Sequence, residues 1–224
     1  MNKQVAVILA GCGVQDGSEI YETTLTLLRL DQLGISYDCF APDIEQHHVV
    51  NHRSGEVAQG ETRNVLVEAA RLARGEISAL DELSVDDYDA VIVPGGFGVA
   101  KNLSNFAEAG ADMVIQDGVR EKLSGFHAVG KPIGLMCIAP VMVPRVLGQG
   151  IAVTIGSDPS VSGAISAMGG LHRGCAVDDI VVDFSNLVVT TPAYMEAQRI
   201  SDAAKGIFKL VDRVNELMEL KSSD

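Results

Sequence analysis

Residues 131–140 (Lys-Pro-Ile-Gly-Leu-Met-Cys-Ile-Ala-Pro) constrain the fold of this chain most, because a short apolar run in them ends at a cysteine and a helix-compatible stretch begins at once. The apolar residues 133–136 suit a buried strand. Pro140 fits the first turn of a helix, where its missing N–H leaves no hydrogen bond unmade. The pattern predicts a sharp strand-to-helix turn with Cys137 at its centre.

Similar apolar runs recur along the chain and alternate with helical patterns. Central parallel strands are predicted at residues 5–10, 36–41, 89–94 and 151–155. Amphipathic helices are predicted after Glu19, at 61–74, around 119–129, after Asp158-Pro159 and at 200–218, and residues 180–191 indicate a β-hairpin. We therefore expect a single α/β domain over residues 1–224, with a mainly parallel sheet and an added hairpin.

Composition excludes several classes of partner. The formal net charge is −13, and no Lys/Arg cluster occurs, so nucleic acid and anionic membranes are not expected as partners. The first apolar run is too short for a secretory signal and no run could span a bilayer, so we expect a cytoplasmic protein. The four cysteines lie far apart without a C-x-x-C pair, which indicates reduced thiols rather than disulfides or a zinc site.

Cys137 is the main candidate for chemistry. At a strand end and a helix N-terminus, the pKa of a thiol can fall from about 8.5 to roughly 3.5–7.5, so we expect part of it to be ionised near neutral pH. The alternative is a structural cysteine that behaves as a small buried hydrophobe. Gly95 and Gly96 follow another predicted strand, and the backbone N–H groups of Gly96 and Ile138 are candidates for an oxyanion site.

The opening loop and a histidine-rich loop supply weaker candidates. Asp16 and Glu19 match the D-x-x-E capping box, so a helix cap explains Glu19 as well as a proton-transfer role does. His52 and His48 in the loop 42–60 would share a helical face, but a third metal ligand is missing, and we predict no metal. A solvated or lid histidine is the favoured interpretation of His52, with proton transfer as the alternative. Cys12 and Cys175 are interpreted as packing or accessory thiols.

Several phrases together resemble the glyoxalase ElbB family: residues 11–19, 93–97 and 136–140, with 51–52, 61–64, 101–106, 178–183 and 190–195. This family is similar to the wider superfamily of class I glutamine amidotransferase-like domains, with the Parkinsonism-associated deglycases and PfpI-type proteases. The resemblance covers almost the whole length. It implies a flavodoxin-like three-layer sandwich, a reactive Cys137, a carboxylate beside it from Glu19, and conversion of glyoxal to glycolate without a cofactor, with deglycation as a related activity.

The chain also departs from the wider superfamily. Amidotransferases pair their cysteine with a distal histidine, but no histidine follows His172. Ile138 stands where PfpI-type proteases have histidine, and Leu135 replaces a small residue. A Cys-His-Glu triad and peptidase chemistry are therefore not expected.

The resulting hypothesis is a lyase: a glutathione-independent glyoxalase that acts on small 2-oxoaldehydes through a Cys137 hemithioacetal. One alternative is a redox-responsive protein that uses the same thiol, and another is a glutamine amidohydrolase. The apolar stripe of the last helix could serve a homodimer, although packing on the chain's own sheet is the favoured explanation.

Overall fold

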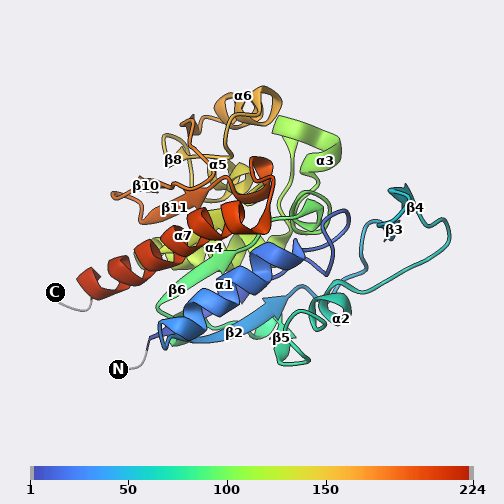
Figure 1. The fold of residues 1–224 in the computed structure, drawn as a ribbon, viewed down its shortest axis with the longest axis horizontal. Helices are drawn as coiled ribbons and strands as arrows, with labels where there is room; N and C mark the ends of the chain where they lie inside the picture. The colour runs from blue at the N-terminus through green and yellow to red at the C-terminus, as the bar shows by residue number, and fades with distance from the viewer. Residues whose placement is uncertain (1–2, 222–224) are drawn as a thin grey trace.

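A computed structural model of the chain describes residues 3–221. Its centre is a seven-stranded sheet in which every strand pair is parallel except the terminal pair β10–β11 (Figure 1). This is the flavodoxin-like arrangement and hairpin that the sequence predicts. Along the sheet the strands are β10 (Val181–Asp183), β11 (Val188–Thr191), β7 (Ile133–Met136), β6 (Ala90–Val93), β1 (Gln4–Ile8), β2 (Ser36–Ala41) and β5 (Ile77–Ala79).

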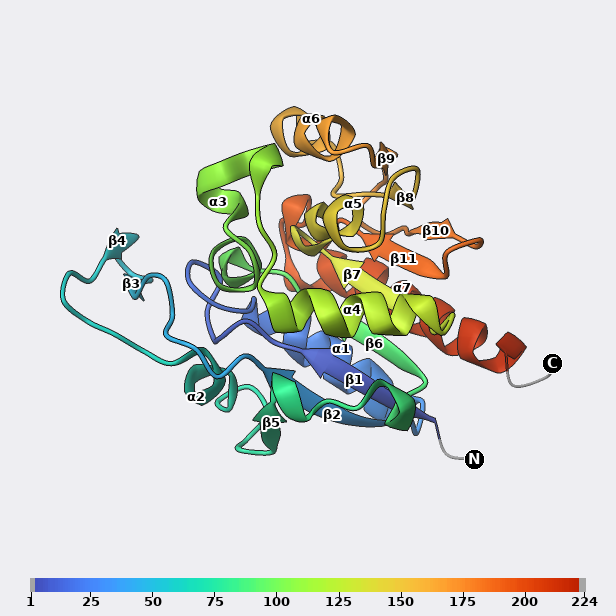
Figure 2. The ribbon, with the colours of Figure 1, turned by 180° about the vertical axis from the view of Figure 1, so that it is seen from behind.

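Helices cover both faces of the sheet. Helices α1 (Ile20–Gln32) and α7 (Ile200–Lys221) lie on one face (Figure 1), and α4 (Asp117–Ala128) lies on the other (Figure 2). The remaining helical segments are α2 (Val65–Ala69), α3 (Phe106–Ala109), α5 (Val143–Val146) and α6 (Pro159–Ala167), the π-helix η3 (Val99–Leu103), and the 3-10 turns η1 (Leu80–Glu82), η2 (Val85–Asp87), η4 (Gly110–Asp112), η5 (Ala139–Met142) and η6 (Ala193–Met195).

Successive side chains of the central strands point alternately to the two faces of the sheet and are buried in two separate apolar cores. In β1, Ile8 points into the core under α4, whereas Val7 points into the core under α7. Both side chains are fully buried. The continuous apolar runs of the sequence therefore reflect strands that are covered on two faces.

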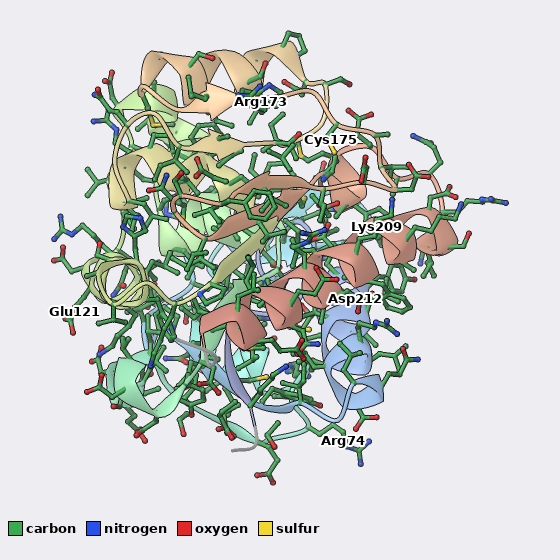
Figure 3. All side chains as sticks on the ribbon, turned by 90° about the vertical axis from the view of Figure 1, so that its left-hand side faces the viewer. Arg74, Glu121, Arg173, Cys175, Lys209 and Asp212 are labelled. Carbon is green, nitrogen blue, oxygen red and sulfur yellow. The ribbon has the colours of Figure 1, made fainter. Side chains whose placement is uncertain are left out.

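The last helix packs on the sheet, as its apolar stripe predicts. Ile207, Val211 and Val214 are buried against the sheet. Figure 3 shows the opposite, polar side, from which Lys209 and Asp212 project. Asp212 is paired with Arg29 of α1 at 2.7 Å, so this ion pair joins the two helices of that face.

Two sequence predictions differ from the structure, and one strand was not predicted. The helix predicted at 61–74 is only α2, because the Asn64 side chain accepts the Val67 N–H and caps a later start. The predicted strand 151–155 is the short β8 (Ala152–Val153), which pairs with β9 (Leu171–His172) outside the main sheet. Strand β5 was not predicted, because its three residues do not form an apolar run.

The face of α1 also differs from the prediction. The sequence predicts an apolar side of this helix made of Ile20, Tyr21, Leu25 and Leu28. Leu25 is partly buried against the core, but Ile20, Tyr21 and Leu28 are exposed. The buried residues are instead Glu22, Thr23, Thr26 and Leu30. Thr26 bonds to the Glu22 carbonyl and Thr23 to the Glu19 carbonyl, so the hydroxyls on this face are satisfied within the helix.

The loop 42–60 carries a small hairpin, β3 (Val50–Asn51) with β4 (Glu56–Val57), which extends away from the sheet (Figure 1). The Val50 N–H donates to Asp16 Oδ2 at 2.7 Å, which fixes the hairpin to the opening loop. In the part of the chain from residue 3 to 221, no helix is both long and apolar enough to cross a membrane.

Candidate active site

Cys137 sits at the predicted strand-to-helix turn. Strand β7 ends at Met136, the turn η5 begins at Ala139, and Cys137 between them has a φ of 58°. This left-handed conformation is unfavourable for a residue with a side chain and persists only where neighbouring structure enforces it. The Cys137 N–H donates to the Thr191 carbonyl at 3.0 Å, so the pairing of β7 with β11 holds the turn.

Gly95 brings a carboxylate to this turn. A Cβ built on Gly95 would lie 2.4 Å from Cys137 Cβ and 2.7 Å from Glu22 Oε2, so only glycine fits between them. The Gly95 N–H donates to Glu22 Oε2 at 2.8 Å, and the Tyr194 N–H donates to Glu22 Oε1 at 3.1 Å. Both carboxylate oxygens are therefore oriented by the backbone, and Glu22 lies within hydrogen-bonding reach of the thiol.

Glu22 is fully buried, and this sets its protonation. Burial, together with the neighbouring Glu19 charge, raises the pKa of Glu22 to about 7, against the lowering effect of the Tyr194 and Gly95 N–H groups and the Cys137 thiol. A carboxyl group with a pKa near neutrality can both accept and donate a proton under physiological conditions.

The expectation of a partly ionised thiol is wrong. Burial and the Glu22 charge raise the pKa of Cys137 well above its ordinary value, although the N–H groups of Gly96 and Ile138 act in the opposite direction. Burial prevails because the side chain is almost completely enclosed. The resting site therefore holds a thiol, and a thiolate forms only when the proton moves to an acceptor.

The two N–H groups predicted for an oxyanion site, those of Gly96 and Ile138, both point at the Cys137 sulfur. Gly96 has a φ of 101°, and a Cβ there would lie 2.3 Å from the Gly17 carbonyl oxygen. Two donors beside the sulfur can stabilise an oxygen that gains negative charge on the adjacent carbon.

A cavity of about 310 Å³ opens at this point of the sheet. Cys137, Gly96, Ile138 and Tyr194 line it, and the rest of the wall is mostly apolar, formed by Val14, Phe97, Ala100, Phe106, Ala107, Asp158, Val161 and Met195. It lies at the carboxyl ends of the parallel strands, where open α/β sheets bind ligands.

Glu19 occupies a different position from the one predicted. Its side chain is the N-cap of α1, where Oε2 accepts the Glu22 N–H at 2.7 Å. Glu22, one helical turn further on, holds the place beside the thiol. Asp16 is not the cap, because its carboxylate bonds to the N–H of Val50 instead.

The histidines are all described, and none lies beside Cys137 or in the wall of the cavity. His52 Nδ1 bonds to the Val50 carbonyl and its Nε2 accepts the Gln15 N–H at 3.1 Å, so His52 connects two loops. His47 Nε2 pairs with Glu108 at 2.9 Å, and the His47 ring lies against the His48 ring, with 4.2 Å between the ring centres. Within residues 3–221, no three His, Cys, Asp or Glu side chains converge as they would around a metal ion.

The accessory thiols lie elsewhere. Cys12 is in the opening loop, where burial and the Glu68 carboxylate raise its pKa. Cys175 lies in the loop before β10 (Figure 3), and burial raises its pKa to about 11. Neither thiol lines the cavity of Cys137.

A mainly parallel sheet in this order, with a cysteine at a strand-to-helix turn, defines the class I glutamine amidotransferase-like fold. No family model matches the chain. Human glutamine amidotransferase-like class 1 domain-containing protein 3, mitochondrial, is 45% identical over an alignment of 223 residues that covers 96% of this chain and 83% of the human protein. The rat ES1 protein homolog, mitochondrial, is 44% identical, with 96% and 84% covered. The chain belongs to this family of glutamine amidotransferase-like class 1 domain and ES1 proteins.

Solved structures agree. An isoprenoid biosynthesis protein with an amidotransferase-like domain from Ehrlichia chaffeensis superposes with a TM-score of 0.90 at 38% identity, over 96% of this chain and 99% of that one. DJ-1beta from Drosophila melanogaster shares the fold, with a TM-score of 0.59 at 18% identity, over 99% of this chain and 98% of that one. The superfamily predicted from the sequence is thereby confirmed.

Proposed function

We propose that this protein is a cofactor-independent glyoxalase, which converts glyoxal and related 2-oxoaldehydes to 2-hydroxy acids at Cys137. The observation that carries the proposal is the buried Glu22 carboxylate beside the Cys137 thiol at the wall of a ligand-sized cavity. Glutamine hydrolysis is the weaker reading, because no histidine lies beside the thiol to act as its base.

The first step is addition of the thiol to the aldehyde. Glu22 takes the proton from Cys137 sulfur while the sulfur attacks the aldehyde carbon, so an S–C bond forms and the carbonyl electron pair moves to oxygen. The N–H groups of Gly96 and Ile138 stabilise that oxygen until Glu22 returns the proton to it. The product of this step is a hemithioacetal.

The second step is an internal redox reaction. Glu22 removes the hydrogen of the thiol-bearing carbon as a proton, and the electron pair passes through an enediol to the second carbonyl. Reprotonation at the second carbon leaves a thioester, so the first carbon is oxidised and the second is reduced. Water then cleaves the C–S bond, the thiol regains its proton, and glyoxal plus one water has become glycolic acid.

The experiment is conversion of ¹³C-labelled glyoxal by the purified protein without glutathione, followed by NMR. We expect glycolate from the unaltered protein and none from Cys137→Ala. Cys175→Ala removes a thiol outside the cavity and serves as the matched control, with unchanged turnover. Full turnover by Cys137→Ala would end the proposal.

Deglycation of early glycation adducts would use the same hemithioacetal and belongs to the same proposal.

Both mammalian relatives are named as mitochondrial proteins, whereas the sequence led us to expect a cytoplasmic one. The cellular location of this protein and its assembly into a homodimer stay predictions. Cell fractionation tests the location, and light scattering tests the homodimer.

A further inference from the structure

The cavity at Cys137 is much larger than glyoxal. If each of the four heavy atoms of glyoxal took the ~30 Å³ that a water molecule occupies, the whole molecule would fill about 120 Å³. The cavity measures about 310 Å³. More than half of it would stay without substrate atoms, which is a poor match for a site that selects a two-carbon compound.

The unfilled part of the cavity is apolar. Phe97 and Phe106 supply aromatic rings, and Val161, Met195 and Ala107 supply aliphatic surface. The Phe97 side chain is 53% exposed, so much of its ring faces solvent in the free protein. A substrate that covered this ring would remove apolar surface from water at both partners.

The charge at the cavity wall has one sign. Asp158 is the only Asp, Glu, Lys, Arg or His among the described residues of this wall, and its Oδ1 accepts the N–H groups of Ser160 and Val161 at 2.9 Å each. Lys101 Nζ lies 5.4 Å from the centre of the Phe97 ring and donates to the Gln15 carbonyl. Lys101 lines a separate cavity of about 80 Å³. Lys101 is outside this wall and already donates to the Gln15 carbonyl, so the charge that a negatively charged substituent meets in the wall is that of Asp158.

We infer that the preferred substrates are neutral 2-oxoaldehydes, R–CO–CHO, in which R is an apolar group about the size of a phenyl ring. This rests on the proposed function and names its substrate class. The aldehyde carbon bonds to Cys137 sulfur, and R occupies the wall of Phe97, Phe106 and Val161. The reaction adds one water and yields R–CHOH–COOH.

The test compares kcat/KM for three probes: glyoxal, phenylglyoxal and 4-carboxyphenylglyoxal. Because burial of a phenyl-sized group favours binding, phenylglyoxal should exceed glyoxal by roughly tenfold or more. The carboxylated probe should fall below phenylglyoxal by about tenfold, and Asp158→Asn, which still caps α6, should remove most of that difference.

Two variants test whether the preference for phenylglyoxal comes from the cavity or from the intrinsic reactivity of the aldehydes. Ala107→Phe places a ring in the cavity from an exposed position of α3 and should lower the phenylglyoxal-to-glyoxal ratio at least tenfold. Val67→Phe adds the same ring to an exposed position of α2, far from the cavity, and should leave the ratio unchanged.

Alkylation of Cys137 by phenacyl bromide and by iodoacetamide, followed by intact mass, gives a readout without turnover. Alkylation that is faster with phenacyl bromide than with iodoacetamide, and that loses this advantage in Ala107→Phe, supports the apolar cavity. This result supports the cavity even if no aldehyde is turned over and the proposed function fails. Turnover of glyoxal with no preference for phenylglyoxal, and no effect of Ala107→Phe on either assay, overturns the inference while the proposed function stands.

Discussion

Glu22 and Cys137 meet across Gly95, whose missing side chain provides the space in which carboxylate and thiol approach each other. The carboxylate comes from the first turn of helix α1 and the thiol from the turn that follows strand β7. Burial raises the pKa of both groups, so Cys137 is a thiol and Glu22, with a pKa of about 7, can hold a proton near neutral pH. The pair therefore holds a proton that can be passed between them.

Glu22→Gln should lower kcat/KM for glyoxal by about 10²- to 10⁴-fold, because the amide cannot take the thiol proton. It should also cost about 1–3 kcal/mol of stability, since the amide nitrogen replaces one of the two oxygens that accept N–H groups from Gly95 and Tyr194. Steady-state kinetics and urea denaturation measure the two effects.

Glu19→Gln is the matched comparison, because the sequence pointed to Glu19 and the structure to Glu22. Its oxygen can still cap α1, so we expect a loss below tenfold. A larger loss from Glu19→Gln than from Glu22→Gln would return the catalytic role to Glu19.

The activity should depend on pH through Glu22. With a pKa of about 7, the carboxylate that accepts the thiol proton is lost as the pH falls. We expect kcat/KM to rise about tenfold per pH unit up to near pH 7 and then to level off. The pH profile of Glu22→Gln should lack this rise, and a rise of the same shape in that variant would assign it to another group.

The free energy of unfolding should fall as the pH rises, whereas the activity should rise. The raised pKa means that folded Glu22 keeps a proton that the unfolded chain releases above pH 4.5. Its contribution is therefore fully present below pH 4.5 and is lost as the pH rises through about 7. The loss is on the order of 3 kcal/mol. The difference in unfolding free energy between the unaltered protein and Glu22→Gln, measured at pH 5 and pH 8, should show it.

Gly95→Ala should abolish activity and destabilise the protein by several kcal/mol, because its Cβ would collide with Cys137 and Glu22. Gly163→Ala is a close control: this glycine lies in α6 with open space around it, so alanine should stabilise the helix by about 1 kcal/mol. Thermal unfolding and glyoxal turnover distinguish the two. Retained turnover in Gly95→Ala would show that the close packing is not required.

Peroxide tests the redox alternative. Because burial holds Cys137 as a thiol, mild peroxide should oxidise it slowly compared with the time of one catalytic turnover. Intact mass over the course of treatment measures the rate. Rapid oxidation at Cys137 together with negligible glyoxal turnover would favour a redox-responsive protein.

The fold was largely predictable because the central strands are buried on both faces. Residues such as Val7, Ile92 and Leu135 therefore form continuous apolar runs that glycine or cysteine ends. The same logic located Cys137 and the glycines beside it. The run 151–155 was assigned to the main sheet although only the short β8 forms there and pairs with β9, because an apolar run shows that a segment is buried but not which strand it pairs with.

Glu22 was not predictable by the usual reading of α1. A helix normally buries its apolar side, and here Ile20 and Tyr21 face outward while Glu22 and Thr26 face the sheet. The available signal was the i, i+4 pair of Glu22 with Thr26, followed by the buried Leu30, which forms a second stripe. The raised pKa of the thiol was equally hidden, because burial depends on packing from distant segments.

The bond from the Cys137 N–H to Thr191 makes the reactive residue the last rung of a ladder in the middle of the sheet. Most of the cavity wall, by contrast, comes from short helices and connecting segments such as α3 and the start of α6. Those segments can lengthen, shorten or change composition while the sulfur keeps its place. A scaffold built this way can acquire new substrates by replacing its walls, without rebuilding its reactive centre.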